Sequence, residues 1–208
     1  NKPHSRGLTL SPALIAPAVM IGLILLLTGL AAQHMNVALW YDEYRSLYNV
    51  GAGFMGPLTI GQILTRIATE NAWQAPTYYL ILDGWGNLVG WSEFATRALS
   101  LFFGLLTVCW IYRFGRDAFN LRVGVLAAIT LGMSGFFVHF LHEMRAYTLI
   151  ALLSIVMIDA YWRLVYRRAG WRSAVLFTGR GEARPSTHCL PGAAPGHPPC
   201  AHHSPPAA

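Results

Sequence analysis

The chain has 208 residues, of which 54% are hydrophobic and 12% are charged, and its formal net charge is +6. Soluble domains carry about 25% charged residues, so this composition, with a mean hydropathy of +0.42, excludes a water-soluble globule. The three cysteines, Cys109, Cys189 and Cys200, form no recognisable metal or redox spacing. We therefore expect an all-α protein, a polytopic bundle of membrane-spanning helices.

The first predicted span covers Ala13 to Ala32. No ionisable residue lies between Gly7 and Gln33, and ~20 apolar residues are the length that a helix needs to cross a bilayer. The stretch is longer than the hydrophobic region of a signal peptide, which has ~7–15 residues. We therefore expect a retained signal anchor, preceded by Lys2 and Arg6.

Three further stretches, 97–112, 123–141 and 146–162, also have the composition of spans, whereas the apolar stretch 77–89 is shorter and carries Asp83 and two glycines. The positive-inside rule decides whether 77–89 crosses the membrane. If it does not cross, two later arginine clusters join the basic N-terminus on the inner side. The members of these clusters are Arg113, Arg116, Arg122, Arg163, Arg167, Arg168 and Arg172. We therefore expect four spans, with 77–89 lying in the outer leaflet.

The long outer segment before 77–89 contains a predicted amphipathic helix. Ile60, Ile63, Leu64 and Ile67 recur at helical spacing, and Pro57 lies just ahead of them, where proline is tolerated. The helix lies either on the membrane surface or against neighbouring helices, and the sequence leaves both interpretations open.

The character of the chain changes after Trp171. Residues 180–208 are rich in Pro, Ala, Gly and His and have almost no large aliphatic residues, so they cannot bury a core. We divide the chain into a membrane region, 1–170, and a tail, 171–208. The tail is either naturally disordered or read in a shifted frame, and the abrupt break favours the second. His197, Cys200, His202 and His203 match no standard zinc spacing.

Ionisable residues at the outer ends of the spans are the candidates for chemistry. Asp42 and Glu43 follow the first span, and Asp42 could act as a general base toward an acceptor hydroxyl. The alternative is a helix N-cap, with both acids favourable to the helix dipole. Arg97 could anchor the second span, bind a lipid phosphate, or pair with a catalytic carboxylate.

A second group follows the third span. Glu143 and Tyr147 are one helical turn apart and would share a face, while Arg145 would point toward headgroup phosphates. The alternative is a structural Arg–Glu pair that closes the turn. His139 and His142 are interpreted as interfacial side chains. Asp159 and Arg163, near the inner end of the last span, are spaced as a structural i,i+4 pair.

These features, in this order over residues 12–168, resemble the N-terminal part of polytopic GT-C glycosyltransferases of the protein O-mannosyltransferase and lipid-A aminoarabinose transferase superfamily. Asp42-Glu43, with Ser46 behind them, resemble the acidic pair of the first outer loop. Residues 74–80 resemble a His-Pro-Pro-Leu-Tyr-Tyr motif, Ser92–Val108 a Ser-Glu-Phe-Ala-x-Arg stretch, and His142–Tyr147 a Gln-Glu-Ala-Arg-x-Tyr motif.

The resemblance implies a multi-pass protein of a bacterial inner membrane, with its site on the periplasmic side and with outer-face juxtamembrane helices. It would transfer a sugar from a polyprenyl-phosphate donor to a lipid, glycan or protein acceptor, with no nucleic acid as partner. Asp42 and Glu43 would be catalytic. The substrate-binding residues would be Arg97, Glu143, Arg145, Tyr147, Gln74 and Tyr78. No cofactor is expected; a divalent metal is compatible with such a site, but the sequence does not indicate one.

The chain departs from the superfamily in two ways. Gln74 and Ala75 stand where relatives carry His-Pro or Glu-Lys before the motif proline. Superfamily members also have more spans, so the sequence predicts an N-terminal fragment that is inactive as written. The alternative functions are a small non-catalytic membrane protein and a transporter subunit. A transport path would place charges in mid-span, where 13–32, 99–112 and 123–138 have none.

Overall fold

A computed structural model describes residues 12–52, 56–72 and 74–166, and every regular element in these ranges is a helix. The helices in chain order are α1 (Pro12–Ala32), α2 (Tyr41–Val50), α3 (Ile60–Glu70), α4 (Pro76–Val89), α5 (Glu93–Ala118), α6 (Leu121–Gly132), α7 (Gly135–Phe140) and α8 (Tyr147–Tyr166). The all-α prediction is confirmed for these residues. The predicted tail, 171–208, and its candidate zinc ligands lie outside them.

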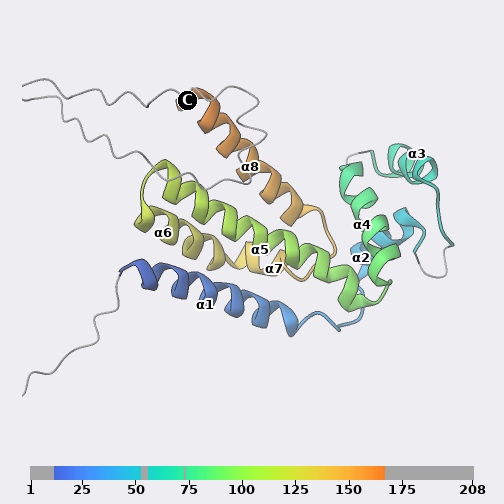
Figure 1. Ribbon diagram of the computed structural model, residues 1–208. Helices are drawn as coiled ribbons and strands as arrows, with labels where there is room; N and C mark the ends of the chain where they lie inside the picture. Colours follow the sequence, from blue (N-terminus) through green and yellow to red (C-terminus); the bar gives the residue numbers. More distant parts are fainter. Residues whose placement is uncertain (1–11, 53–55, 73, 167–208) are drawn as a thin grey trace, which may run out of the picture.

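The helices form an elongated bundle with a smaller group at one end (Figure 1). α5 lies in the middle, α1 and α6 run beside it, and α8 covers another side. The short helices α2, α3 and α4 gather at the end where α5 begins. We call this the α2–α4 end, and the other end, where α5 finishes, the Asp117 end.

Within the described ranges, three helices are long and apolar enough to cross a membrane: Ile15–Ala32 within α1, α5 and α8. The predicted second span, 97–112, was too short, because the helix runs on over 26 residues from Glu93 to Ala118. The predicted third span, 123–141, is not one helix. It is divided into α6 and α7 at Met133, and Ser134 caps α7 by accepting from the Phe137 amide. With 12 residues, α6 rises only about 18 Å, so the fourth span is not confirmed.

The predicted surface stretch 77–89 is helix α4, which packs against α2, α3 and the start of α5. Thr59 and Gln62 form a capping box that starts α3. Ile63 and Ile67 of α3 are fully or almost fully buried against α4, whereas Ile60 and Leu64 remain 63% and 40% exposed. The interpretation of α3 as a helix packed on its neighbours is thus confirmed for one of its apolar faces.

Two apolar clusters hold these parts together. One joins the α2–α4 end to the start of α5 and α8 and includes Tyr78, Leu82 and Leu99. The other joins α1 to α5, α6 and α7 and includes Leu27, Val108 and Leu141. Where α5 meets α6, a Cβ on Gly124 would lie 2.5 Å from the carbonyl oxygen of Tyr112, so only glycine allows this approach.

An ion-pair network occupies the Asp117 end. Arg163 Nε donates to Asp159 Oδ1 over 2.8 Å, which confirms the predicted i,i+4 pair. Arg163 Nη2 also lies 3.8 Å from Asp117 Oδ2, so the network ties α8 to α5. Arg116 and Arg113 reach the same aspartate at 2.9 and 3.8 Å.

Candidate functional site

The charged residues predicted from the sequence meet at the α2–α4 end. Asp42 and Glu43 lie in the first turn of α2, and Arg97 lies in the second turn of α5. Glu143 and Arg145 belong to the turn between α7 and α8. Ion pairs and hydrogen bonds connect these five side chains or their immediate neighbours. We call them the charged cluster.

Glu43 and Arg97 form a buried, two-pronged ion pair in the middle of the cluster. Arg97 Nε donates to Glu43 Oε1 over 2.8 Å, and Nη2 donates to Oε2 over 2.5 Å. Both side chains are nearly without solvent exposure, at 4% and 1%. Glu43 Oε1 also accepts from the Met144 amide over 3.1 Å. The pair therefore joins α2, α5 and the α7–α8 turn. Of the options that the sequence left open for Arg97, pairing with a carboxylate is the one observed.

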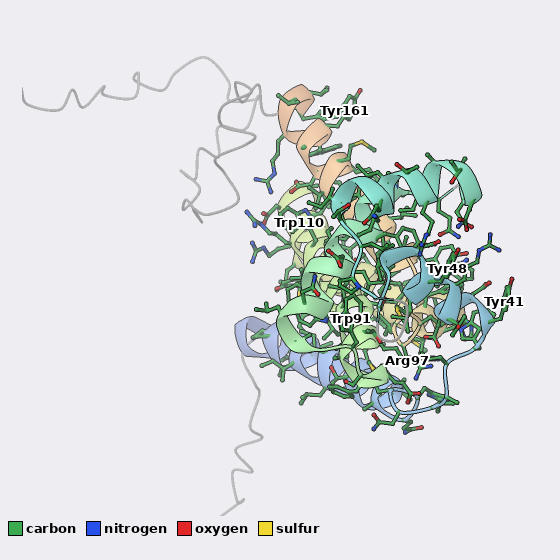
Figure 2. All side chains as sticks on the ribbon, turned by 90° about the vertical axis from the view of Figure 1, so that its right-hand side faces the viewer. Tyr41, Tyr48, Trp91, Arg97, Trp110 and Tyr161 are labelled. Atoms are coloured by element: carbon green, nitrogen blue, oxygen red, sulfur yellow. The ribbon has the colours of Figure 1, made fainter. Side chains whose placement is uncertain are left out.

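The remaining Arg97 donors are used by the segment that leaves α1. Nη1 donates to the carbonyl oxygens of His34, Met35 and Val37, and Nη2 lies 3.4 Å from that of Ala38. A guanidinium has five N–H groups, so none is left over for a lipid phosphate. Figure 2, which looks onto the α2–α4 end, shows Arg97 set among these elements, whereas Tyr41 projects at the margin. This geometry favours a positioning role for Arg97.

Asp42 differs from its neighbour Glu43 in exposure and in bonding. Its side chain is 34% exposed, and its ionic partner is Arg145, whose Nη2 lies 3.6 Å from Asp42 Oδ2. Arg145 itself is only 10% exposed and lies over the Tyr147 ring at 5.8 Å. The helix starts one residue before Asp42, with Trp40 as N-cap, so the alternative of an Asp42 cap is wrong. Asp42 thus presents a carboxylate to solvent beside a cation.

Glu143 is buried and pairs with a histidine. Its Oε1 lies 2.9 Å from His139 Nε2. Burial raises the pKa of Glu143, and His139 partly offsets this. α8 begins only at Tyr147, so Glu143 and Tyr147 do not share a helix face, contrary to the sequence-based expectation. A structural Glu143–Arg145 pair is not observed among the described contacts; each residue has another partner.

Three histidines lie beside the cluster. The rings of His34 and His142 are stacked with centroids 4.6 Å apart, and His139 approaches His142 edge-on at 5.6 Å. Burial lowers the pKa of His142, and the neighbouring His34, His139 and Arg97 lower it further. Within the described ranges, no group of three or more His, Cys, Asp and Glu side chains is placed to hold a metal ion. The three imidazole rings thus pack on one another beside the cluster.

The other predicted substrate-binding residues, Tyr78, Tyr147 and Gln74, lie around the charged cluster or away from it. Tyr78 is fully buried, and its hydroxyl lies 3.4 Å from Ser100 Oγ, beneath the cluster. Burial raises its pKa. Tyr147 is 41% exposed and reaches the cluster through Arg145. Gln74 is half-buried, and neither atom of its amide has a hydrogen-bond partner among the described residues. No described contact joins Gln74 to the cluster.

Several participants were not identified from the sequence. They are the carbonyl groups of residues 34–38 and the Met144 amide. Backbone groups leave no sequence signal. Ser46, which the sequence placed behind the acidic pair, donates to the carbonyl oxygens of Asp42 and Met144.

Comparison with known proteins found no relatives: no family model, no curated protein and no solved structure matches the chain. The fold and the site define the chain as a helical protein with three helices suited to a membrane and a charged cluster at one end.

Proposed function

We propose that the protein is a GT-C type glycosyltransferase that transfers a sugar from a polyprenyl-phosphate donor to a hydroxyl acceptor at an outer membrane surface. The observation that carries the proposal is the position of Asp42, a partly exposed carboxylate next to Arg145, where three described helices long and apolar enough to cross a membrane meet three shorter ones. A hydrophobic donor and a polar acceptor can meet only at such a boundary.

Asp42 is the general base in this proposal. It takes the proton of the acceptor hydroxyl while the oxygen attacks the anomeric carbon and the bond to the donor phosphate breaks. Negative charge then grows on the departing polyprenyl phosphate. Arg145, at 3.6 Å from Asp42, is the nearby cation that would stabilise this charge.

Glu43 and Arg97 act as positioning residues in the same proposal. Their buried pair fixes the first turn of α2 against α5 and the α7–α8 turn, and so sets the distance between Asp42 and Arg145. Glu143, Tyr147, Gln74 and Tyr78 remain predicted substrate-binding residues. Of these four, Gln74 has the strongest structural support as a substrate-binding residue, because its amide nitrogen and oxygen have no hydrogen-bond partner among the described residues.

The test is sugar transfer by the full-length protein in lipid nanodiscs, with a panel of polyprenyl-phosphate-linked hexoses and pentoses. Asp42→Asn keeps the shape of the side chain but removes the base, so we expect a loss of roughly 10²–10⁴-fold in kcat. Asp83→Asn is the matched control, because Asp83 lies at the same end on α4 and contacts only Asn87 there. An undiminished rate with Asn at position 42 would refute the role of Asp42 as the general base. A wild-type protein that transfers none of these sugars would refute the function.

A further inference from the structure

A groove between α1 and α6 lies far from the charged cluster. It has a volume of about 370 Å³ and is lined by Ile15, Ala16, Val19, Leu121, Arg122, Val125 and Leu126. All of these residues except Arg122 are apolar. Volumes of ~300–1,000 Å³ are typical of ligand sites. The groove is open to the surroundings of the bundle, because Ile15 and Leu126 are 46% and 62% exposed.

The packing of α1 on α6 explains why the groove exists. Toward the α2–α4 end the two helices are in close contact, since a Cβ on Gly132 would lie 2.8 Å from Leu23 Cδ1. Toward the Asp117 end, the groove is lined by residues from the N-terminal halves of both helices. The groove is therefore a slot at one end of two helices, open along its length to the surroundings of the bundle.

Arg122 gives the groove a charge at its rim. Arg113, Arg116 and Arg163, the other described arginines at this end, contact Asp117. Among the described residues, Arg122 has no hydrogen bond, ion pair or ring contact. It also lies in the first turn of α6, where the helix dipole attracts anions. A cation with no partner among the described residues, at the mouth of an apolar slot, is complementary to a ligand with one anionic group and one hydrocarbon chain.

We infer that this groove binds an anionic glycerophospholipid, with an acyl chain along Val19 and Val125 and the phosphate at Arg122. The occupant is a membrane lipid because the groove lies on α1, a helix suited to cross a bilayer, and opens where acyl chains would surround it. A neutral lipid could fill the slot but would leave Arg122 without a counter-charge. The site is separate from the proposed sugar transfer at the α2–α4 end.

The experiment is lipid retention by the full chain, measured by native mass spectrometry in detergent during titration with phosphatidylglycerol or phosphatidylcholine. We expect one phosphatidylglycerol to bind at least about tenfold more tightly than phosphatidylcholine, since a hydrogen bond to a charged group is worth that much. Arg122→Gln should remove this preference. Arg116→Gln, which removes the same charge at the same end outside the groove, should keep it.

A second pair of variants tests the slot. Val19→Phe fills the groove and should abolish retention of both lipids, whereas Val165→Phe, the same change at a 49% exposed position of α8, should not. Equal binding of the two lipids by the wild type would overturn the inference. So would equal losses with Gln at 116 and at 122. A doubled mass that Val19→Phe abolishes would show that a second copy of the chain occupies the groove, and would also overturn it.

Discussion

The two ends of the bundle each hold an arginine paired with a carboxylate, but the two pairs are built differently. At the Asp117 end, Arg163 and Asp159 are four residues apart on one helix, and a second aspartate lies within 3.8 Å. At the α2–α4 end, Arg97 and Glu43 are 54 residues apart, and the arginine also holds carbonyl groups of the chain leaving α1. The first pair is local and has a substitute partner, whereas the second connects three segments and has none.

This difference teaches that a charge at the end of a span has two separate uses. Arg163 stabilises a turn of α8 that would form without it, and through Asp117 it also holds α8 to α5. Arg97 determines how separate segments meet, and its burial makes the pair costly to break. The predictions below test this contrast, beginning with the largest expected effect.

Replacing Arg97 should destabilise the protein most. Arg97→Met leaves Glu43 buried without a counter-charge and releases the carbonyl groups of residues 34–38, so we expect a loss of about 3–5 kcal/mol. The measurement is unfolding of the purified protein, followed by tryptophan fluorescence. Arg45→Met is the matched control, because Arg45 makes one exposed contact with the Glu70 carbonyl group. It should change stability by less than about 0.5 kcal/mol. Equal losses of stability in Arg97→Met and Arg45→Met would contradict the role of Arg97 in joining separate segments.

Replacing Asp159 should cost less. Asp159→Asn weakens the 2.8 Å contact with Arg163, but Asp117 remains near the guanidinium, so we expect about 1.5–3 kcal/mol in the same unfolding assay. Asp83→Asn on α4 serves as the control and should have almost no effect. If the loss at position 159 reached that of Arg97→Met, the local pair would be as important as the long-range one.

The smallest expected effect is a pH dependence of stability that arises at the α2–α4 end, beside the charged cluster. The pKa of His142 is lowered from 6.5 by burial and by His34, His139 and Arg97, while Glu43 opposes this. The neutral ring is therefore favoured in the folded state, and stability should fall as the pH drops through 6.5. His142→Phe keeps a ring that cannot be protonated, so it should reduce this fall in unfolding temperature between about pH 8 and 5. An unchanged fall would show that His142 is not responsible.

Much of the fold follows from patterns that are local in the chain. The apolar stretch 13–32 became α1 at Pro12–Ala32, and the spacing of Ile63 and Ile67 gave the buried face of α3. The pairing of Asp159 with Arg163 follows from helical spacing in the same way. Helix length and periodicity depend on neighbouring residues, so one sequence is enough to predict them.

The errors arose where distant segments decide the structure. The break between α6 and α7 is set by the Ser134 cap and by packing, and it ends a stretch that composition alone had predicted as one span. In the candidate site, the sequence identified the charged residues but not their partners. That Glu43 pairs with Arg97, and Asp42 with Arg145, depends on how three turns meet in space. No spacing in the chain encodes that meeting.

The central claim is that two adjacent acids, Asp42 and Glu43, have different tasks: one is free for chemistry and the other holds the fold. The most direct test compares the unfolding free energies of Asp42→Asn and Glu43→Gln with that of the wild type in one membrane mimetic. We expect Glu43→Gln to lose about 3–5 kcal/mol, because it leaves Arg97 unpaired, and Asp42→Asn to lose less than about 1 kcal/mol, because its contact is partly exposed. Equal losses, or a larger loss at Asp42, would contradict the division.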